Sequence, residues 1–152
     1  MNTPIKVAVL GAGIMGKNHL RTYKNLSNFE LIGVYDIFPE AAQAAAEAFG
    51  IKAFSSLEEV ASSVDAVSVV TTSVTHAEVG EFFLNRGIHC LIEKPLATSK
   101  DECMRLINAA KNNNVTLLVG HIADQVARRF GYSFRPASRR RSIHCRTEGC
   151  NC

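Results

Sequence analysis

Three glycines near the N-terminus have the spacing of a dinucleotide-binding turn. Gly11, Gly13 and Gly16 form a G-x-G-x-x-G motif directly after the apolar run at 5–10. The first glycine of such a motif permits a tight turn, the second lets the backbone approach a pyrophosphate, and the third lets helix pack on strand. The N–H groups at the positive end of the following helix then face the phosphates. The motif predicts a pyrophosphate-binding segment made of Gly11, Ala12, Gly13, Ile14, Met15 and Gly16.

A carboxylate follows at the distance that such a site requires. Asp36 lies 20 residues after the last glycine of the motif, at the end of a second apolar run at 31–35. A carboxylate there accepts hydrogen bonds from the adenosine ribose hydroxyls. It also repels the 2′-phosphate of NADP, for which neighbouring Ile37 and Phe38 supply no cation, so NAD is predicted in preference to NADP. Helix capping by Asp36 ahead of Pro39 is a second interpretation, compatible with the first.

A third chemical signal is the sequence Glu93-Lys94-Pro95, directly after an apolar run at 89–92. A lysine at the end of a strand is suited to orient a substrate hydroxyl, or to help remove its proton while hydride leaves the same carbon. Lys94 is therefore the candidate catalytic residue, and Glu93 is expected to pair with it or to line the nicotinamide pocket. A solvated turn before the next helix is the alternative, which spacing alone does not separate from the catalytic interpretation.

The elements that would position these residues alternate between strand and helix up to residue 122. Continuous apolar runs predict strands covered on both faces, at 5–10, 30–35, 52–54, 66–71, 89–92 and 115–119. Three S/T-x-x-E capping boxes predict helix starts, at Ser55 with Glu58, Thr75 with Glu78, and Ser99 with Glu102. Such βαβ alternation predicts an α/β fold, a Rossmann-type doubly wound parallel sheet in three α/β/α layers.

Ligands of doubly wound sheets bind at the carboxyl ends of the strands. Five groups of polar or glycine residues follow the expected strands, at 11–16, 36, 71–76, 93–95 and 120–121. We therefore expect these groups to gather at one edge of the sheet.

Composition limits the class of protein. The 152 residues, 47% hydrophobic and 20% charged, suit one globular core and are too few for two ordinary domains. No apolar stretch approaches the about 20 residues of a membrane span, and the N-terminus has no secretory signal pattern. Five cysteines form no disulfide-like framework. A cytoplasmic protein with no membrane partner is therefore expected.

Charge divides the chain in two. Residues 1–122 carry 10 Lys and Arg against 12 Asp and Glu, a net charge of −2, whereas residues 123–152 carry seven Arg against two acids, a net charge of +5. Three of the five cysteines also fall in this C-terminal segment (residues 123–152). We therefore predict an NAD(P)-binding Rossmann domain at 1–122 and an atypical Arg- and Cys-rich segment at 123–152, expected to be disordered or not a native continuation.

Together these motifs resemble the Gfo/Idh/MocA family of oxidoreductases. The resemblance covers about residues 1–122 and rests on the glycine motif with His19, on Asp36, on the runs at 71–76 and 93–97, and on Val119-Gly120-His121. It implies oxidation or reduction at a carbinol carbon of a sugar, cyclitol or nucleotide-sugar. Family members carry a further substrate domain of about two hundred residues, with most substrate contacts and the main catalytic base; that domain is expected to be absent here.

The resemblance also implies roles for individual residues. Thr71, Thr72 and His76 line the cofactor cleft, Glu93 lies by the nicotinamide ribose, and Lys94 contacts the substrate. Thr72 stands where the family often has proline, which leaves that loop's geometry open. His76 alternatively occupies a helix start. His19 and His121 are expected to be pocket walls or hydrogen-bonded polar groups.

The C-terminal segment leaves three interpretations open. It is a non-native continuation such as a frameshift product, a basic arm for an acidic partner such as nucleic acid, or a metal site built from its histidine and cysteines; the first is favoured and the last has no recognised ligand spacing. We expect no metal and no nucleic-acid partner, while homo-oligomer formation stays open. A non-enzymatic nucleotide-binding or redox-sensing module with a basic effector segment is the alternative to an oxidoreductase domain.

Overall fold

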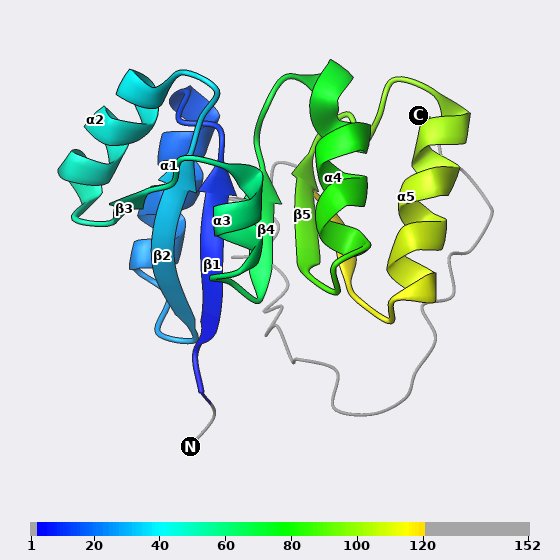
Figure 1. Ribbon diagram of the computed structural model, residues 1–152, viewed down its shortest axis with the longest axis horizontal. Helices are drawn as coiled ribbons and strands as arrows, with labels where there is room; N and C mark the ends of the chain where they lie inside the picture. Colours follow the sequence, from blue (N-terminus) through cyan, green and yellow to red (C-terminus); the bar gives the residue numbers. More distant parts are fainter. Residues whose placement is uncertain (1–2, 121–152) are drawn as a thin grey trace, which may run out of the picture. The chain divides into compact units, whose positions relative to one another are not determined.

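The computed structural model describes residues 3–120, which form a parallel sheet flanked by helices (Figure 1). The strands are β1 (Ile5–Leu10), β2 (Phe29–Tyr35), β3 (Lys52–Ala53), β4 (Ala66–Val69), β5 (His89–Glu93) and β6 (Leu117–Gly120). The helices are α1 (Ile14–Lys24), α2 (Pro39–Phe49), α3 (Leu57–Ala61), α4 (His76–Leu84) and α5 (Lys100–Asn112), with a 3-10 turn η1 (Ser73–Thr75) before α4. The six strands lie in the order β3-β2-β1-β4-β5-β6 and every pair is parallel. This is the strand order of a Rossmann sheet, which confirms the predicted fold class.

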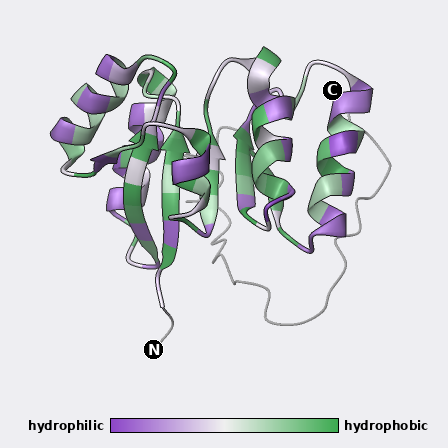
Figure 2. Cartoon of the chain, in the orientation of Figure 1, coloured by the Kyte–Doolittle hydropathy of each residue, from purple (hydrophilic) through white to green (hydrophobic). Residues whose placement is uncertain are grey.

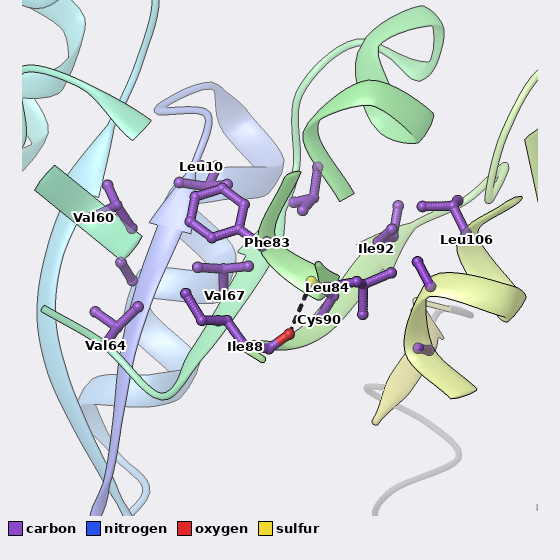
Figure 3. Close-up of a cluster of buried hydrophobic side chains, with 14 of the residues drawn as sticks. Leu10, Val60, Val64, Val67, Phe83, Leu84, Ile88, Cys90, Ile92 and Leu106 are labelled. Carbon is purple, nitrogen blue, oxygen red and sulfur yellow. Dashed lines mark hydrogen bonds between the residues drawn. The ribbon is translucent and has the colours of Figure 1, made fainter. Parts of the chain in front are cut away.

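Two apolar cores lie on opposite faces of the sheet. Successive strand residues point to opposite sides, so Ala8 and Leu10 of β1 join one core while Val9 joins the other. The larger core takes side chains from α3, α4 and α5, with Phe83 among its fully buried members (Figure 3). The smaller core takes side chains from α1 and α2, including Leu20. Figure 2 shows the resulting layers, with hydrophobic strands between helices that carry hydrophilic outer residues.

Coverage on both faces holds for the centre of the sheet and fails at its edge. The last four residues of β1 are fully buried, as predicted. On β6, by contrast, Leu118 and Val119 are 42% and 38% exposed among the residues that the structure describes. The expectation of two covered faces is therefore wrong for β6 within this part of the chain.

The longest described helix, α5, has 13 residues, and no helix in residues 3–120 is long and apolar enough to cross a membrane.

The ends of α2 and α5 follow their sequence signals. Pro39 is the first residue of α2, and Gly50 ends it with a φ of 65°. At α5 the predicted capping box is confirmed: the Ser99 hydroxyl accepts from the N–H of Glu102 at 3.2 Å. The Glu102 carboxylate in turn accepts from the N–H of Thr98 at 2.9 Å. Pro39 thus removes one orphan N–H group from the start of α2, and Ser99 satisfies one at the start of α5.

The other two predicted capping boxes are wrong. At α3 the box is displaced by one residue: Ser56 accepts from the N–H of Glu59, whose carboxylate accepts from the N–H of Ser55. This register lets Leu57 and Val60 both pack against the larger core. Before α4, Thr75 occupies the N-cap position, but its side chain accepts no hydrogen bond from the helix. Its hydroxyl instead donates to the hydroxyl of Thr71 and to the carbonyl of Thr72.

The imidazole of His89 joins β5 to the start of β6. The N–H of Thr116 donates to His89 Nδ1 at 2.9 Å, which requires an unprotonated Nδ1. Burial lowers the pKa of His89 below its usual 6.5, and nearby Asp65 opposes this shift. The folded state therefore binds this proton less readily than the unfolded chain, so the stability contribution is complete above pH 6.5 and is lost as the pH falls through the folded pKa.

A His89→Asn variant tests this acid sensitivity. Its side-chain oxygen can accept from the N–H of Thr116 at any pH, so we expect the free energy of unfolding to fall less between pH 7.5 and pH 5.5 than in the wild type. Urea denaturation at the two pH values measures the difference, and an unrelated exposed substitution, Lys17→Gln, serves as control. An identical pH dependence in wild type and His89→Asn would contradict the assignment.

Candidate functional site

The glycine turn between β1 and α1 admits no side chain at two of its three glycines. Gly11 has a φ of 107°, and a Cβ there would lie 2.5 Å from the carbonyl oxygen of Val70. A Cβ on Gly16 would overlap the carbonyl oxygen of Gly11. The N–H of Gly11 also donates to the carbonyl of Tyr35 at 2.8 Å. The turn is therefore packed tightly against the ends of β2 and β4 and against α1, as predicted from the spacing.

The middle glycine of the motif, Gly13, faces open space. No heavy atom lies within 4 Å of the position that its Cβ would take. Gly13 is the N-cap residue of α1, where no side chain caps the helix and the first turn has no acidic residue. The first turns of α3 and α5, by contrast, have a serine cap and two acidic residues each. The N–H groups at the start of α1 are thus uncompensated by side chains, a fit to the negative charge of a pyrophosphate.

Asp36 is bonded directly to the glycine turn. Its Oδ2 accepts from the N–H of Ala12 at 2.7 Å, and its Oδ1 accepts from the N–H of Phe38 at 3.0 Å. Phe38 is the N-cap residue of α2, so the interpretation of Asp36 as a helix cap is wrong. The carboxylate instead lies at the carboxyl end of β2, one hydrogen bond from the glycine turn. Ile37 and Phe38 beside it are 73% and 60% exposed.

The loop after β4 is joined to the loop after β5 by one side chain. His76, 1% exposed, lies with Nε2 3.1 Å from the carbonyl oxygen of Thr71 and with Nδ1 2.8 Å from that of Pro95. Thr75 contributes a hydroxyl that donates to the hydroxyl of Thr71 at 2.8 Å. Thr72 is the N-cap residue of η1. His76 is the first residue of α4, and its buried ring joins the two loops through two carbonyl groups. Its contribution to cofactor binding stays a prediction.

Glu93 and Lys94 lie at the end of β5. The Glu93 carboxylate accepts from the backbone N–H of Lys94 at 3.2 Å, so the expected pairing is with the lysine backbone. Within residues 3–120 the Lys94 ammonium group has no hydrogen-bond or ion-pair partner. The Lys94–Pro95 peptide bond is cis. Lys94 is exposed, and its amino group is available to a ligand at the place where the sequence predicts the reacting hydroxyl.

Sequence reasoning missed two contacts of the site. His19 Nε2 lies 2.9 Å from Glu93 Oε1, which confirms His19 as a hydrogen-bonded polar group but was not predicted as a pair. Gly120, at the end of β6, lies directly against the Glu93 carboxylate. Neither contact has a local signal in the sequence, because the partners are far apart along the chain and only the tertiary fold brings them together. His121 and the candidate ligands of the C-terminal segment lie outside the described residues, and within residues 3–120 no cluster of His, Cys, Asp or Glu could hold a metal.

The strand order, the glycine turn and the carboxylate at the end of β2 define an NAD(P)-binding Rossmann domain. Residues 5–121 match the family model GFO_IDH_MocA, described as an oxidoreductase family with an NAD-binding Rossmann fold. The chain therefore belongs to the Gfo/Idh/MocA family, which confirms the resemblance seen in its motifs.

Similar proteins include dehydrogenases with different substrates. Over 118 residues the chain is 37% identical to a UDP-N-acetylglucosamine 3-dehydrogenase of Acidithiobacillus ferrooxidans, covering 78% of this chain and 37% of that protein. It is 35% identical over 117 residues to scyllo-inositol 2-dehydrogenase (NADP(+)) IolU of Bacillus subtilis, and this match covers 75% of this chain and 36% of that protein. The chain thus spans little more than a third of the length of these relatives.

A solved structure of similar fold has been described with its ligands. The WlbA dehydrogenase of Bordetella pertussis, in complex with NADH and UDP-GlcNAcA, superposes with a TM-score of 0.76 at 30% sequence identity. The match covers 84% of this chain and 37% of that one. The names of these proteins include both NADH and NADP(+), so the family relationship establishes NAD(P) binding without choosing between the two cofactors.

Proposed function

We propose that this chain is the cofactor-binding domain of an NAD-dependent dehydrogenase acting on a hydroxyl-bearing carbon of a sugar, cyclitol or nucleotide-sugar. The observation that carries the proposal is the uncapped start of α1 beside Gly13, bonded through Ala12 to the Asp36 carboxylate. This arrangement offers hydrogen-bond donors to a pyrophosphate and acceptors to the adjoining ribose. The substrate class is supported by the names of the relatives, which act on UDP-N-acetylglucosamine and on an inositol.

At the adenosine end, Asp36 favours NAD. Its two oxygens are fixed by backbone N–H groups, and no Lys or Arg pairs with it in the described part of the chain. Each carboxylate oxygen retains acceptor capacity for a ribose hydroxyl. The 2′-phosphate of NADP would meet this negative charge instead of a cation.

At the nicotinamide end, the loops after β4 and β5 form the proposed walls. Thr71 and Thr72 follow β4, and Glu93 ends β5 beside Lys94. When bound, the nicotinamide ring supplies hydride acceptance or donation. Lys94, whose ammonium group has no partner in residues 3–120, orients the substrate hydroxyl and supports transfer of its proton. Glu93 provides an acceptor for the neighbouring ribose.

Replacing Asp36 with asparagine tests the cofactor preference. The asparagine side chain keeps one acceptor oxygen, enough for one of the two backbone N–H groups that Asp36 binds, and it removes the charge. We therefore expect the preference for NADH over NADPH to fall by about tenfold or more, which corresponds to about 1.4 kcal/mol. Calorimetric titration of both cofactors into both proteins measures it. Glu40→Gln, which removes a charge in the first turn of α2, is the matched control. An unchanged preference in Asp36→Asn would count against the assignment.

Catalysis by this chain alone is expected to be weak. Its relatives are almost three times as long as the segments that they share with it, and we propose that their remaining length supplies most substrate contacts and the main base. Robust turnover of polyols or nucleotide-sugars by the purified 152-residue chain would overturn this expectation. We propose a cytoplasmic location, the one expected from the cysteine pattern of the sequence.

A further inference from the structure

A histidine and a glutamate from opposite halves of the domain meet beneath the proposed nicotinamide end. His19 lies on α1 and Glu93 ends β5, 74 residues later. Their Nε2 and Oε1 atoms are 2.9 Å apart, and the two side chains are only 14% and 16% exposed. Because a carboxylate only accepts hydrogen bonds, Nε2 of His19 carries the proton. Water competes weakly for a hydrogen bond in such an enclosed place.

Two further contacts confine the same carboxylate. The backbone N–H of Lys94 donates to Glu93 Oε2 at 3.2 Å. On the other side lies Gly120, where a Cβ would come within 2.7 Å of Oε1 and 2.8 Å of Cδ. The carboxylate thus has one oxygen held by α1 and one held by the following residue, with the backbone of β6 against it.

We propose that His19 is a positioning residue for the nicotinamide half of the cofactor. By holding Oε1 it fixes the orientation in which Glu93 accepts hydrogen bonds from the nicotinamide ribose, and through Oε2 it steadies the backbone that carries Lys94. Gly120 serves the same purpose by leaving room for the carboxylate in this orientation. The inference rests on the proposed function, because it assigns the ligand that Glu93 meets.

The position of His19 on α1 allows a positioning role to be separated from a structural one. The same helix begins at the glycine turn, so damage to α1 would weaken the binding of any ligand that carries a pyrophosphate. ADP has the adenosine ribose and the two phosphates but lacks the nicotinamide riboside. A residue that acts through Glu93 alone changes the affinity for NADH and leaves that for ADP unchanged.

The test compares dissociation constants of NADH and ADP, measured by calorimetry on the full chain. We expect His19→Phe, which keeps a planar ring without a donor, to weaken NADH binding about tenfold, as expected for one hydrogen bond to a charged group. ADP binding should change less than about twofold on the same grounds. His19→Gln retains an N–H donor and should recover most of the affinity for NADH. Glu93→Gln should weaken NADH binding similarly, and the double variant should be no weaker than either single one.

Each outcome decides the matter. Equal losses for NADH and ADP in His19→Phe would show a structural role and overturn the inference, as would unchanged NADH binding. Gly120→Ala supplies a second variant away from α1, with the same selective loss of NADH affinity expected. A wild type that binds ADP but gains nothing from the nicotinamide half would overturn the inference and leave the adenosine site intact. A wild type that binds neither ligand would overturn the proposed function and the inference with it.

Discussion

Replacing Gly16 with alanine is expected to destabilise the folded protein by about 3 kcal/mol or more, at the upper end of what overpacking does. The added Cβ would overlap the carbonyl oxygen of Gly11 and lie 2.8 Å from its carbonyl carbon. Backbone atoms cannot rotate away as a flexible side chain can. Gly11 itself is held by a 2.8 Å hydrogen bond to Tyr35 and by its closeness to Val70. The overlap can therefore be removed only if α1 moves away from the sheet, which would open the smaller core around Leu20.

Thermal denaturation measures this effect. For a chain of this size the expected loss lowers Tm by about 10 °C. Gly13→Ala is the matched control in the same turn, because no heavy atom lies within 4 Å of the added Cβ. Alanine at an N-cap position destabilises by no more than about 1 kcal/mol, so its Tm should change little. Similar Tm values for Gly16→Ala and Gly13→Ala would show that the turn is not packed as described.

The fold could be predicted because its signals are local. The glycine spacing, the apolar runs and Pro39 each act within a few residues, and the alternation of strand and helix is what predicts the parallel sheet observed here. Element ends were less accurate for a physical reason. The strand predicted from residue 115 begins at Leu117, since the N–H of Val115 bonds to the end of α5 and that of Thr116 to His89.

The site was predictable at the level of strand ends, and its internal contacts were not. Asp36, Glu93 and Lys94 lie where the sequence placed them, because each directly follows or ends a strand. Which atoms they bond depends on tertiary geometry. His76 bonds to Pro95, which is 19 positions further along the chain, and His19 pairs with Glu93 across a separation of 74 positions. The predicted capping serine of α3 is wrong for the same reason. Ser56 caps this helix in place of Ser55, because packing against the core determines which residues of α3 face inward.

Gly13→Asp is expected to abolish NADH binding while leaving the fold at least as stable. The open space beside Gly13 accommodates the new side chain without a clash. Aspartate is a good N-cap residue, so its carboxylate would accept from the N–H groups at the start of α1 and gain from the helix dipole, each effect stabilising by a few tenths to about 1 kcal/mol. Those N–H groups are the ones that the proposed pyrophosphate needs. The same carboxylate would therefore both fill the phosphate position and repel the phosphate charge.

The signature of this variant is opposite changes in stability and in binding. We expect the dissociation constant for NADH to rise by at least about 100-fold, equivalent to about 3 kcal/mol, while Tm stays equal or increases. Calorimetry and thermal denaturation on the same preparation test both halves. Gly13→Asn is the matched control, because it caps the helix and occupies similar volume without the charge, so its loss of affinity should be smaller. NADH binding that survives Gly13→Asp unchanged would place the cofactor elsewhere, whereas a large fall in Tm would show that the space beside Gly13 is filled. If the phosphates bind at the start of α1, the carboxylate of Gly13→Asp stabilises the fold and prevents NADH binding at the same place. A phosphate site elsewhere would leave NADH binding intact.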